Sequence, residues 1–311
     1  MGTNSTSGAK STAGNRSAGQ KLARLLADSP LMAPGRALME RNFRDFYLPL
    51  NKWQKLAAGS YLILKDYSEG IFPPTFDDQA KAYQAEIDYF GSMPGAEKEK
   101  VIVSHIVKPF WGAPSFSKYS RDFIQLQQCF DALGLKQGSR LLELGCGCGW
   151  TAEFLALSGY RIVGTTIAPD DVMIANKRSL ALAARGLSAD LMSFKVAPME
   201  TVDQAMGNDR QFDAVFVFEA LHHAFDWRAA IQAACRCLRP GGWLLLANEP
   251  NLLHTFVSYR VARLTNTHEI GMSQSELIGE MKKGGCPEIR VFQPGFDNKV
   301  TAHWLAGRKA I

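Results

Sequence analysis

A short apolar segment that runs directly into a glycine-rich turn is the feature that most constrains this chain. Residues Arg140–Leu144 have the composition of a buried strand, and residues 145–149 alternate glycine with cysteine before a helical pattern begins near Trp150. Glycines let the backbone turn sharply and approach a ligand closely, because no Cβ stands in the way. The pattern predicts a ligand-binding crevice at the carboxyl end of a parallel strand.

Short apolar runs alternate with helical stretches from Ser117 to the end of the chain, which is typical of a parallel sheet covered by helices. We predict strands near residues 140–144, 161–167, 191–196, 212–218, 242–248, 287–293 and 300–306. We predict helices near residues 150–158, 170–186, 224–238 and 273–283. The fold class is therefore predicted as α/β, with a seven-stranded, doubly wound sheet.

Composition divides the chain into three regions. Residues 1–20 are mostly small and polar and are predicted to be a disordered tail, because they cannot bury enough apolar surface. Residues 21–116 combine short helical patterns with many aromatic side chains, and they are predicted to form a helical cap over the mouth of the crevice. Residues 117–311 form the predicted α/β domain.

Charge and apolar content limit the location and the partners. The chain contains no apolar run of about eighteen residues and no apolar leader at its N-terminus, so we expect it to be cytoplasmic. The net charge is +5, and residues 1–60 contain nine Lys or Arg against three Asp or Glu without forming a run. A nucleic-acid partner would need denser basic residues. We therefore predict no nucleic-acid partner.

The six cysteines give no sign of a metal site. Cys146 and Cys148 lie inside the glycine turn, and Cys235 and Cys237 are two residues apart in a predicted helix, where they point to different sides. Neither pair has the spacing of a zinc site. We therefore predict no metal.

An acidic residue next to the turn indicates the type of ligand. Glu143 precedes Gly145 by two residues, and the third glycine follows the second by two residues, unlike the three of the dinucleotide fingerprint. A pyrophosphate bound at this helix start would be repelled by Glu143. A positively charged adenosine compound without phosphate fits the turn better.

The segment from Glu143 to Gly149 resembles the first motif of the class I S-adenosylmethionine-dependent methyltransferases, acid-x-Gly-x-Gly-x-Gly. The resemblance continues in order through residues 212–215, 221–223 and 238–242. It implies a Rossmann-like methyltransferase sheet, S-adenosylmethionine as the cofactor, and in-line methyl transfer to oxygen, nitrogen or carbon of a small-molecule acceptor. The cofactor-binding residues that it implies are Glu143, Gly145, Cys146, Gly147, Gly149, Thr166, Ile167, Met199, Glu200 and Glu219.

Two positions depart from the family pattern. Thr166 stands where most members have an acid for the ribose hydroxyls, and Asp170 is a neighbour that could compensate. The run from Thr166 to Pro169 is similar to the cyclopropane fatty acyl phospholipid synthase branch, so a lipid-modifying enzyme whose basic arm touches a membrane is an alternative. A non-catalytic cofactor- or partner-binding protein is the other. Pro198 is the second position, because it stands where the family often has an Asp near the adenine amine. Glu200 either accepts from that amine or starts a helix.

Residues near the methyl group come from the ends of the fourth and fifth strands. A sulfonium makes the methyl carbon electrophilic, so a general base is needed only if the acceptor must lose a proton. His223 is the preferred base and His222 the second candidate, while either one could instead orient the loop. The predicted acceptor pocket is apolar and aromatic, and its candidate residues are Tyr119, Phe110, Trp111 and Glu249, where Glu249 could instead end its strand. His254 is a further candidate.

Overall fold

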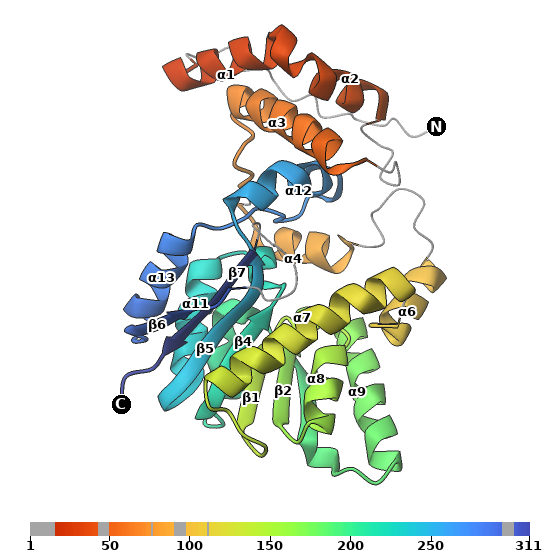
Figure 1. The fold of residues 1–311 in the computed structure, drawn as a ribbon, viewed down its shortest axis with the longest axis vertical. Coiled ribbons are helices and arrows are strands. Elements are labelled where there is room, and N and C mark those ends of the chain that lie inside the picture. Colours follow the sequence, from red (N-terminus) through yellow and green to blue (C-terminus); the bar gives the residue numbers. More distant parts are fainter. Residues whose placement is uncertain (1–15, 43–49, 76, 90–97, 111, 294–301) are drawn as a thin grey trace, which may run out of the picture.

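The computed structural model describes residues 16–42, 50–75, 77–89, 98–110, 112–293 and 302–311. Trp111 and residues 1–15 of the tail predicted at residues 1–20 lie outside the described part, and residues 18–20 of that tail are helical. In the described part, seven strands form one sheet with the order β3-β2-β1-β4-β5-β7-β6, in which β7 is antiparallel to its neighbours (Figure 1). The strands are β1 Arg140–Leu144, β2 Arg161–Thr166, β3 Met192–Val196, β4 Phe212–Phe218, β5 Leu238–Pro250, β6 Glu288–Val291 and β7 Ala302–Arg308. The predicted α/β class and the seven-stranded sheet are confirmed.

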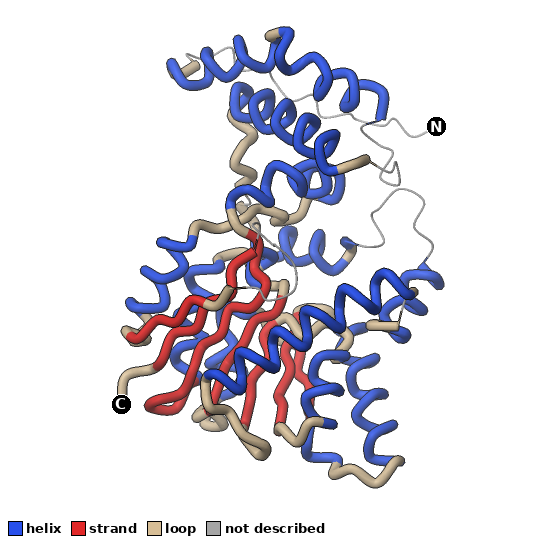
Figure 2. The backbone as a smooth tube through the Cα atoms, viewed as in Figure 1, coloured by secondary structure: helices blue, strands red, loops and turns tan. Residues whose placement is uncertain are grey.

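Helices cover both faces of this sheet (Figure 2). The first face is covered by α7 Ala113–Ala132, α8 Trp150–Leu157 and α9 Pro169–Ala184. The second face is covered by α10 Val202–Met206, α11 Trp227–Cys237 and α13 Gln274–Lys283. The central strands are apolar at nearly every position because both of their faces are buried. The domain boundary predicted between residues 116 and 117 falls inside α7.

The N-terminal helices divide into two groups. α1 Ala18–Asp28, α2 Ala33–Asn42 and α3 Lys52–Glu69 pack with α12 Leu252–Thr265 at one end of the molecule (Figure 1). The second group, α4 Gln79–Ile87 and α6 Lys98–Val107, contributes residues to the crevice. Short 3-10 turns complete the described elements, namely η1 Pro30–Met32, η2 Ala189–Leu191, η3 Met199–Thr201 and η4 Leu221–His223. Only part of the predicted cap therefore lies over the crevice.

A small core and a buried ion pair hold α3 against α12. Tyr259 is fully buried there, and its hydroxyl donates to Asp66 at 2.9 Å. The Nε of Arg263 donates to the same carboxylate at 2.6 Å. A Cβ at Gly59 would lie 1.7 Å from the carbonyl oxygen of Phe256, so the two helices approach as closely as glycine permits. α12 was not predicted, and it connects the N-terminal helices to the α/β domain.

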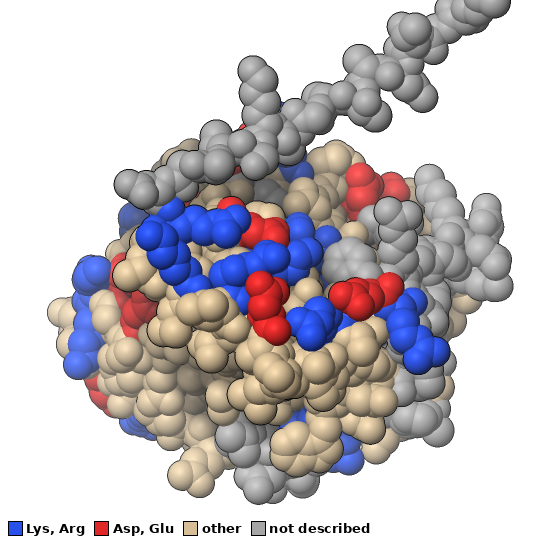
Figure 3. Space-filling model, turned by 90° about the horizontal axis from the view of Figure 1, so that it is seen from above, with Lys and Arg blue, Asp and Glu red and all other residues tan. Residues whose placement is uncertain are grey.

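The end of the molecule that carries α1, α2 and α3 has a surface of mixed charge. Figure 3 shows it from above, with Lys and Arg side chains next to Asp and Glu side chains. Arg24, for example, contacts Asp28 at 2.8 Å and Glu69 at 3.5 Å. Among the described helices, none is long and apolar enough to cross a membrane.

Candidate active site

The glycine turn has the conformation that its sequence predicts. Gly145 and Gly147 both have positive φ, +72° and +48°, which L-residues with a side chain rarely adopt. A Cβ at Gly145 would lie 2.5 Å from the Cβ of Ala220 and 2.6 Å from the Cε of Met199. At Gly147 the nearest atom to a Cβ would be Oδ2 of Asp171, at 3.8 Å. Gly145 is therefore needed for packing, whereas Gly147 faces open space.

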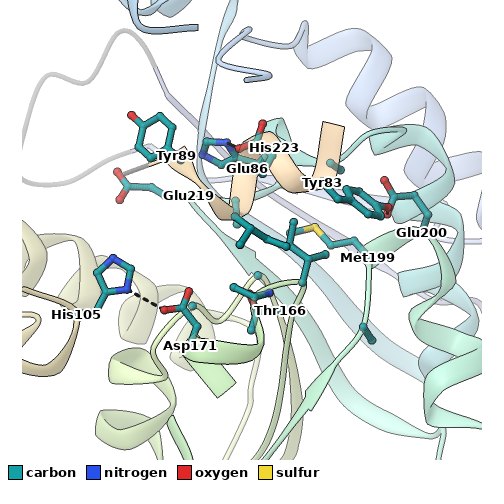
Figure 4. Close-up of a pocket in the computed structure, with 18 of the residues that line it drawn as sticks. Tyr83, Glu86, Tyr89, His105, Thr166, Asp171, Met199, Glu200, Glu219 and His223 are labelled. Carbon is teal, nitrogen blue, oxygen red and sulfur yellow. Dashed lines mark hydrogen bonds and ion pairs between the residues drawn. The ribbon is translucent and has the colours of Figure 1, made fainter. Parts of the chain in front are cut away.

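That space is a cavity of about 270 Å³ at the carboxyl ends of β1, β2, β3 and β4 (Figure 4). Of the residues predicted to bind the cofactor or act in catalysis, those that line it are Gly145, Gly147, Thr166, Ile167, Met199, Glu200, Glu219 and His223. Three residues line the cavity from the opposite side: Tyr83 and Glu86 on α4, and Tyr89, which lies two residues beyond the end of α4. We call this space the first cavity. The sequence interpretation named none of these three residues.

Three of the predicted cofactor residues lie beneath the first cavity and do not line it. Cys146 is buried, and Gly149 packs against Ala175 and Phe194. Glu143 is 2% exposed, and burial raises the pKa of its carboxyl to about 8, although a hydrogen bond with Thr151 opposes this shift. Its Oε2 atom has no hydrogen-bond partner in the described part of the chain. A direct cofactor contact by these residues remains a prediction.

Thr166 replaces the acid that most of the family uses for the ribose, and the acid that accompanies it in the cavity is not the expected one. Thr166 lines the first cavity, and its hydroxyl oxygen accepts weakly from the backbone N–H of Ala168 at 3.4 Å. Asp170, the expected compensating residue, is exposed on α9. Asp171 lines the cavity instead and contacts Nδ1 of His105 at 2.8 Å (Figure 4). Of these two acids, only Asp171 lines the first cavity together with Thr166.

Glu200 is engaged by the protein itself. Its Oε2 accepts from the hydroxyl of Tyr83 at 2.6 Å, and its Oε1 accepts from the backbone N–H of Asp226 at 2.9 Å. Burial together with the hydrogen bond to Glu200 raises the pKa of Tyr83. Glu200 thus connects α4 to the start of α11, and Met199 beside it has its side chain directed into the cavity (Figure 4).

Glu249 holds the loop that follows β4. It is fully buried, and Oε1 accepts from the backbone N–H groups of Ala220 and Leu221 at 2.8 and 3.0 Å. Oε2 lies 3.0 Å from Nδ1 of His222. Burial would raise the pKa of Glu249, but these hydrogen bonds outweigh it and lower the pKa. Both carboxylate oxygens of Glu249 are used inside the loop, so an acceptor contact by Glu249 stays a prediction without support from its contacts.

His223 is paired with a carboxylate from α4. Its Nδ1 lies 2.8 Å from Oε2 of Glu86, whose Oε1 accepts from the backbone N–H of His268 at 2.8 Å. Burial alone would lower the pKa of His223, but Glu86 and the nearby Glu269 outweigh it and raise the pKa to about 9. His223 was preferred as a base on the premise of a neutral imidazole near pH 7, and the structure contradicts that premise.

A second cavity, of about 440 Å³, adjoins the first and shares Tyr89 and Glu219 with it. Most of its lining residues carry polar side chains, and the residues are Tyr89, Lys118, Glu219, His222, Asn248, Pro250, His254, Glu269 and Ala302. We call this space the second cavity. Sequence reasoning missed Lys118, Asn248 and Glu269, because no local pattern brings these three residues together.

The predicted acceptor residues lie elsewhere. Tyr119 packs on Trp150 with a ring-centroid distance of 5.5 Å, and neither cavity includes it. Phe110 stacks on Phe116 at 5.1 Å and is 61% exposed. Trp111 lies outside the described residues. Neither cavity is lined by Tyr119 or Phe110, so the predicted aromatic acceptor pocket stays a prediction.

Glu219 stands between the two cavities in a strained conformation. It ends β4 with a φ of +52°, although it is not glycine. Its Oε1 accepts from Nζ of Lys118 at 3.0 Å and from Nδ2 of Asn248 at 2.5 Å. A strained backbone conformation persists only where surrounding contacts hold it in place, and such conformations are concentrated at functional sites. Glu219 is therefore positioned for contact with ligands on either side.

The residues of the first cavity fit a positively charged adenosine compound. The turn at Gly147 leaves room for close approach, and Met199 offers a soft apolar side chain for a ring. Asp171 and Glu219 line the cavity as acids, and Glu143 beneath it has a carboxyl oxygen without a partner among the described residues, which a cationic ligand would favour in its ionised form. This donor set favours a ligand with an ammonium or sulfonium group.

Comparisons with known proteins agree with this fit. The methyltransferase domain family matches residues 142–246. The solved structure of magnesium protoporphyrin IX methyltransferase from Synechocystis with bound SAH covers 74% of this chain and 100% of that chain, at 16% identity and a TM-score of 0.54. Residues 142–246 match a methyltransferase domain, and the solved structure shares the fold. Together with the strand order and the glycine turn, these findings support a class I S-adenosylmethionine-dependent methyltransferase with S-adenosylmethionine as its cofactor.

Among individual proteins, the similar ones include ubiquinone biosynthesis O-methyltransferases. The protein from Hydrogenovibrio crunogenus is 28% identical over 158 residues, which are 48% of this chain and 62% of that protein. The protein from Bordetella bronchiseptica is 26% identical over 208 residues, which are 62% of this chain and 83% of that protein. The chain thus spans less than two thirds of the Hydrogenovibrio relative.

Proposed function

We propose that this chain transfers the methyl group of S-adenosylmethionine to an oxygen atom of a small, polar acceptor. The observation that carries the proposal is that two cavities meet at Tyr89 and Glu219. The first adjoins the glycine turn and takes the cofactor. The second is polar, has the volume of a small-molecule site and takes the acceptor.

The bound cofactor supplies an electrophilic methyl group, so the chain has to orient the acceptor and exclude water. We assign Gly145 and Gly147 to the methionine part of the cofactor, Thr166 and Asp171 to the ribose, and Met199 to the adenine. All five line the first cavity. α4 lies across this cavity and limits its access to water.

The lining of the second cavity favours oxygen as the methylated atom and a polar acceptor. Lys118 and Asn248 are donors there, and Glu269 is an acceptor, so a molecule with several hydroxyl or carbonyl groups would be bound by hydrogen bonds. The similar proteins named above are O-methyltransferases. A lipid acyl chain would displace water from these polar groups and offer them no hydrogen bonds, which argues against the cyclopropane-synthase alternative.

His222 is the histidine placed to contact the acceptor. Its Nδ1 lies against Glu249, so its Nε2 remains available, and the residue lines the second cavity. His223 lines the first cavity and is held by Glu86. Of the two histidines predicted to act in catalysis, the proposal therefore assigns the acceptor contact to His222.

The proposal is tested with methyl-labelled S-adenosylmethionine, a cell extract as the source of acceptor, and identification of the labelled product. Gly147→Val places a side chain in the cofactor cavity and should weaken cofactor binding at least about 100-fold by calorimetry and abolish labelling. Gly186→Val is the matched control, since Gly186 also has positive φ and open space around it but does not line the cavity. Equal labelling by the parent and Gly147→Val would refute the assignment.

A further inference from the structure

We propose that His222, His223 and Glu269 bind a divalent cation of the zinc type where the two cavities meet. Binding of the cation does not depend on the function proposed above, and only its action on the acceptor rests on that function. The ligand atoms of these three residues lie within 4.8 Å of one another. The two histidines follow β4 in η4, and Glu269 lies between α12 and α13, so the site joins segments that are distant in sequence.

The distances between the ligand atoms fit an intervening ion better than direct bonds. Nε2 of His222 lies 4.0 Å from Oε2 of Glu269, and Nε2 of His223 lies 3.8 Å from Oε1 of the same carboxylate. Both distances are too long for hydrogen bonds. Two metal–ligand bonds of about 2.0–2.2 Å span up to about 4.2 Å, and tetrahedral zinc would draw the atoms to about 3.4 Å. A movement of roughly half an ångström would complete the site.

Both imidazoles are oriented by carboxylates on their other nitrogen. Nδ1 of His222 lies 3.0 Å from Glu249, and Nδ1 of His223 lies 2.8 Å from Glu86. Metal-binding histidines commonly donate the second ring N–H to a carboxylate, which fixes the ring and directs the free lone pair to the metal. Here the contact of His222 with Glu249 is such a hydrogen bond, and His223 lies at ion-pair distance from Glu86. The Nε2 atoms of both rings lie within 4.0 Å of Glu269.

Charge also favours a cation at this position. The carboxylates of Glu86, Glu249 and Glu269 surround the two imidazole rings, whose centroids are 4.1 Å apart. The side chains of the three glutamates are 8%, 0% and 12% exposed. Water therefore screens this concentration of negative charge poorly, and a divalent ion bound to neutral imidazoles would compensate much of it.

Three protein ligands leave a coordination position open, as in catalytic rather than structural zinc sites. His222 and Glu269 line the second cavity, and His223 lines the first, so the open position faces the space assigned to the acceptor. An acceptor with a hydroxyl or carbonyl oxygen would bind there and be polarised by the cation. The contact of His222 with the acceptor would then be made through the cation. The expectation of no metal came from the spacing of cysteines, which take no part in this site.

The test is a zinc titration of the full chain after chelator treatment, without cofactor or acceptor, against a chromogenic zinc chelator. We expect one equivalent of Zn²⁺ per chain. Glu269→Gln and the double variant His222→Ala, His223→Ala should bind at least about 100-fold more weakly, and Glu86→Gln about 10- to 100-fold more weakly. His254→Ala is the control, since His254 lines the second cavity outside the cluster, and it should bind as the parent does.

The absence of saturable zinc binding by the parent would overturn the proposal, and so would unchanged affinity in Glu269→Gln. Circular dichroism of each variant shows whether it is folded, and Glu86→Gln retains all three ligands if the ligand variants fail to fold. Calorimetry with S-adenosylmethionine on the metal-stripped chain separates the two proposals. Cofactor binding without zinc binding refutes the metal site alone, whereas zinc binding without cofactor binding refutes the proposed function.

Discussion

The two cavities that meet at Glu219 are built in different ways. The first rests on the backbone of one continuous segment, β1 and its glycine turn, with the ends of the neighbouring strands beside it. The second consists of side chains from α7, β5, α12, and the segments after β4 and before α13. A site made of backbone depends on local sequence, whereas a site made of side chains depends on tertiary contacts. The first should therefore tolerate side-chain changes better than the second.

The largest effect is expected from Glu249→Ala, beneath the second cavity. This change removes the acceptor for the backbone N–H groups of Ala220 and Leu221 and for Nδ1 of His222 in a fully buried position. We expect a loss of about 3–5 kcal/mol in the free energy of unfolding, because buried donors are left without partners. Urea denaturation followed by circular dichroism measures this loss.

Glu288→Ala is the matched control, since Glu288 lies on the edge strand β6 with its side chain 45% exposed. Its replacement should change the free energy of unfolding by no more than about 0.5 kcal/mol. If Glu249→Ala were as mild as this control, the loop after β4 would not depend on its buried carboxylate, and the contrast between the two cavities would be lost.

A somewhat smaller effect should appear in the pH dependence of stability through Glu143. Its pKa is about 8 in the folded chain against an ordinary 4.5, so between these values the folded state holds a proton that the unfolded state has lost. The free energy of unfolding of the parent should therefore fall as the pH rises from 5 to 8. Glu143→Gln removes this contribution, so its stability relative to the parent should rise by roughly 3 kcal/mol over that range.

Urea denaturation of both proteins at pH 5, 6.5 and 8 measures this difference, and Glu288→Gln serves as the exposed control with no expected trend. A constant difference between Glu143→Gln and the parent would mean that Glu143 is ionised in the folded chain. The buried acid beneath the first cavity would then already be charged in the absence of a cationic ligand.

The same division between local sequence and tertiary contacts decides which elements could be predicted from the sequence. The strands from β1 to β4 lie within one residue of their predicted ends, because each is a continuous apolar run between turn residues. α12 was missed, although Asn251 caps its start and Asn266 ends it with positive φ. The packing of α12 against α3 depends on contacts such as Asp66 with Arg263, whose residues are 197 positions apart. No local pattern reports a contact of that kind.

The site shows the same limit at the level of single residues. Gly147 and Thr166 were predicted from their distance to a strand end, and both line the first cavity. Glu269 comes from a segment with no distinctive pattern, and it reaches the second cavity through the fold of α12. His223 was recognised as a site residue, but its protonation depends on Glu86, 137 residues earlier in the chain. The sequence therefore predicted that His223 lies in the site, but it did not predict the protonation state of that residue.

The smallest effect is expected from Thr166→Val, which removes one hydroxyl from the first cavity and retains the shape of the side chain. The lost interaction is a single neutral hydrogen bond to the ribose, worth about 1 kcal/mol, so the affinity for S-adenosylmethionine should fall about fivefold by calorimetry. Asp171→Asn is the comparison, because a charged acceptor in the same cavity should matter more. A loss of 100-fold or more for Thr166→Val would show that side chains, and not the backbone of the turn, hold the cofactor.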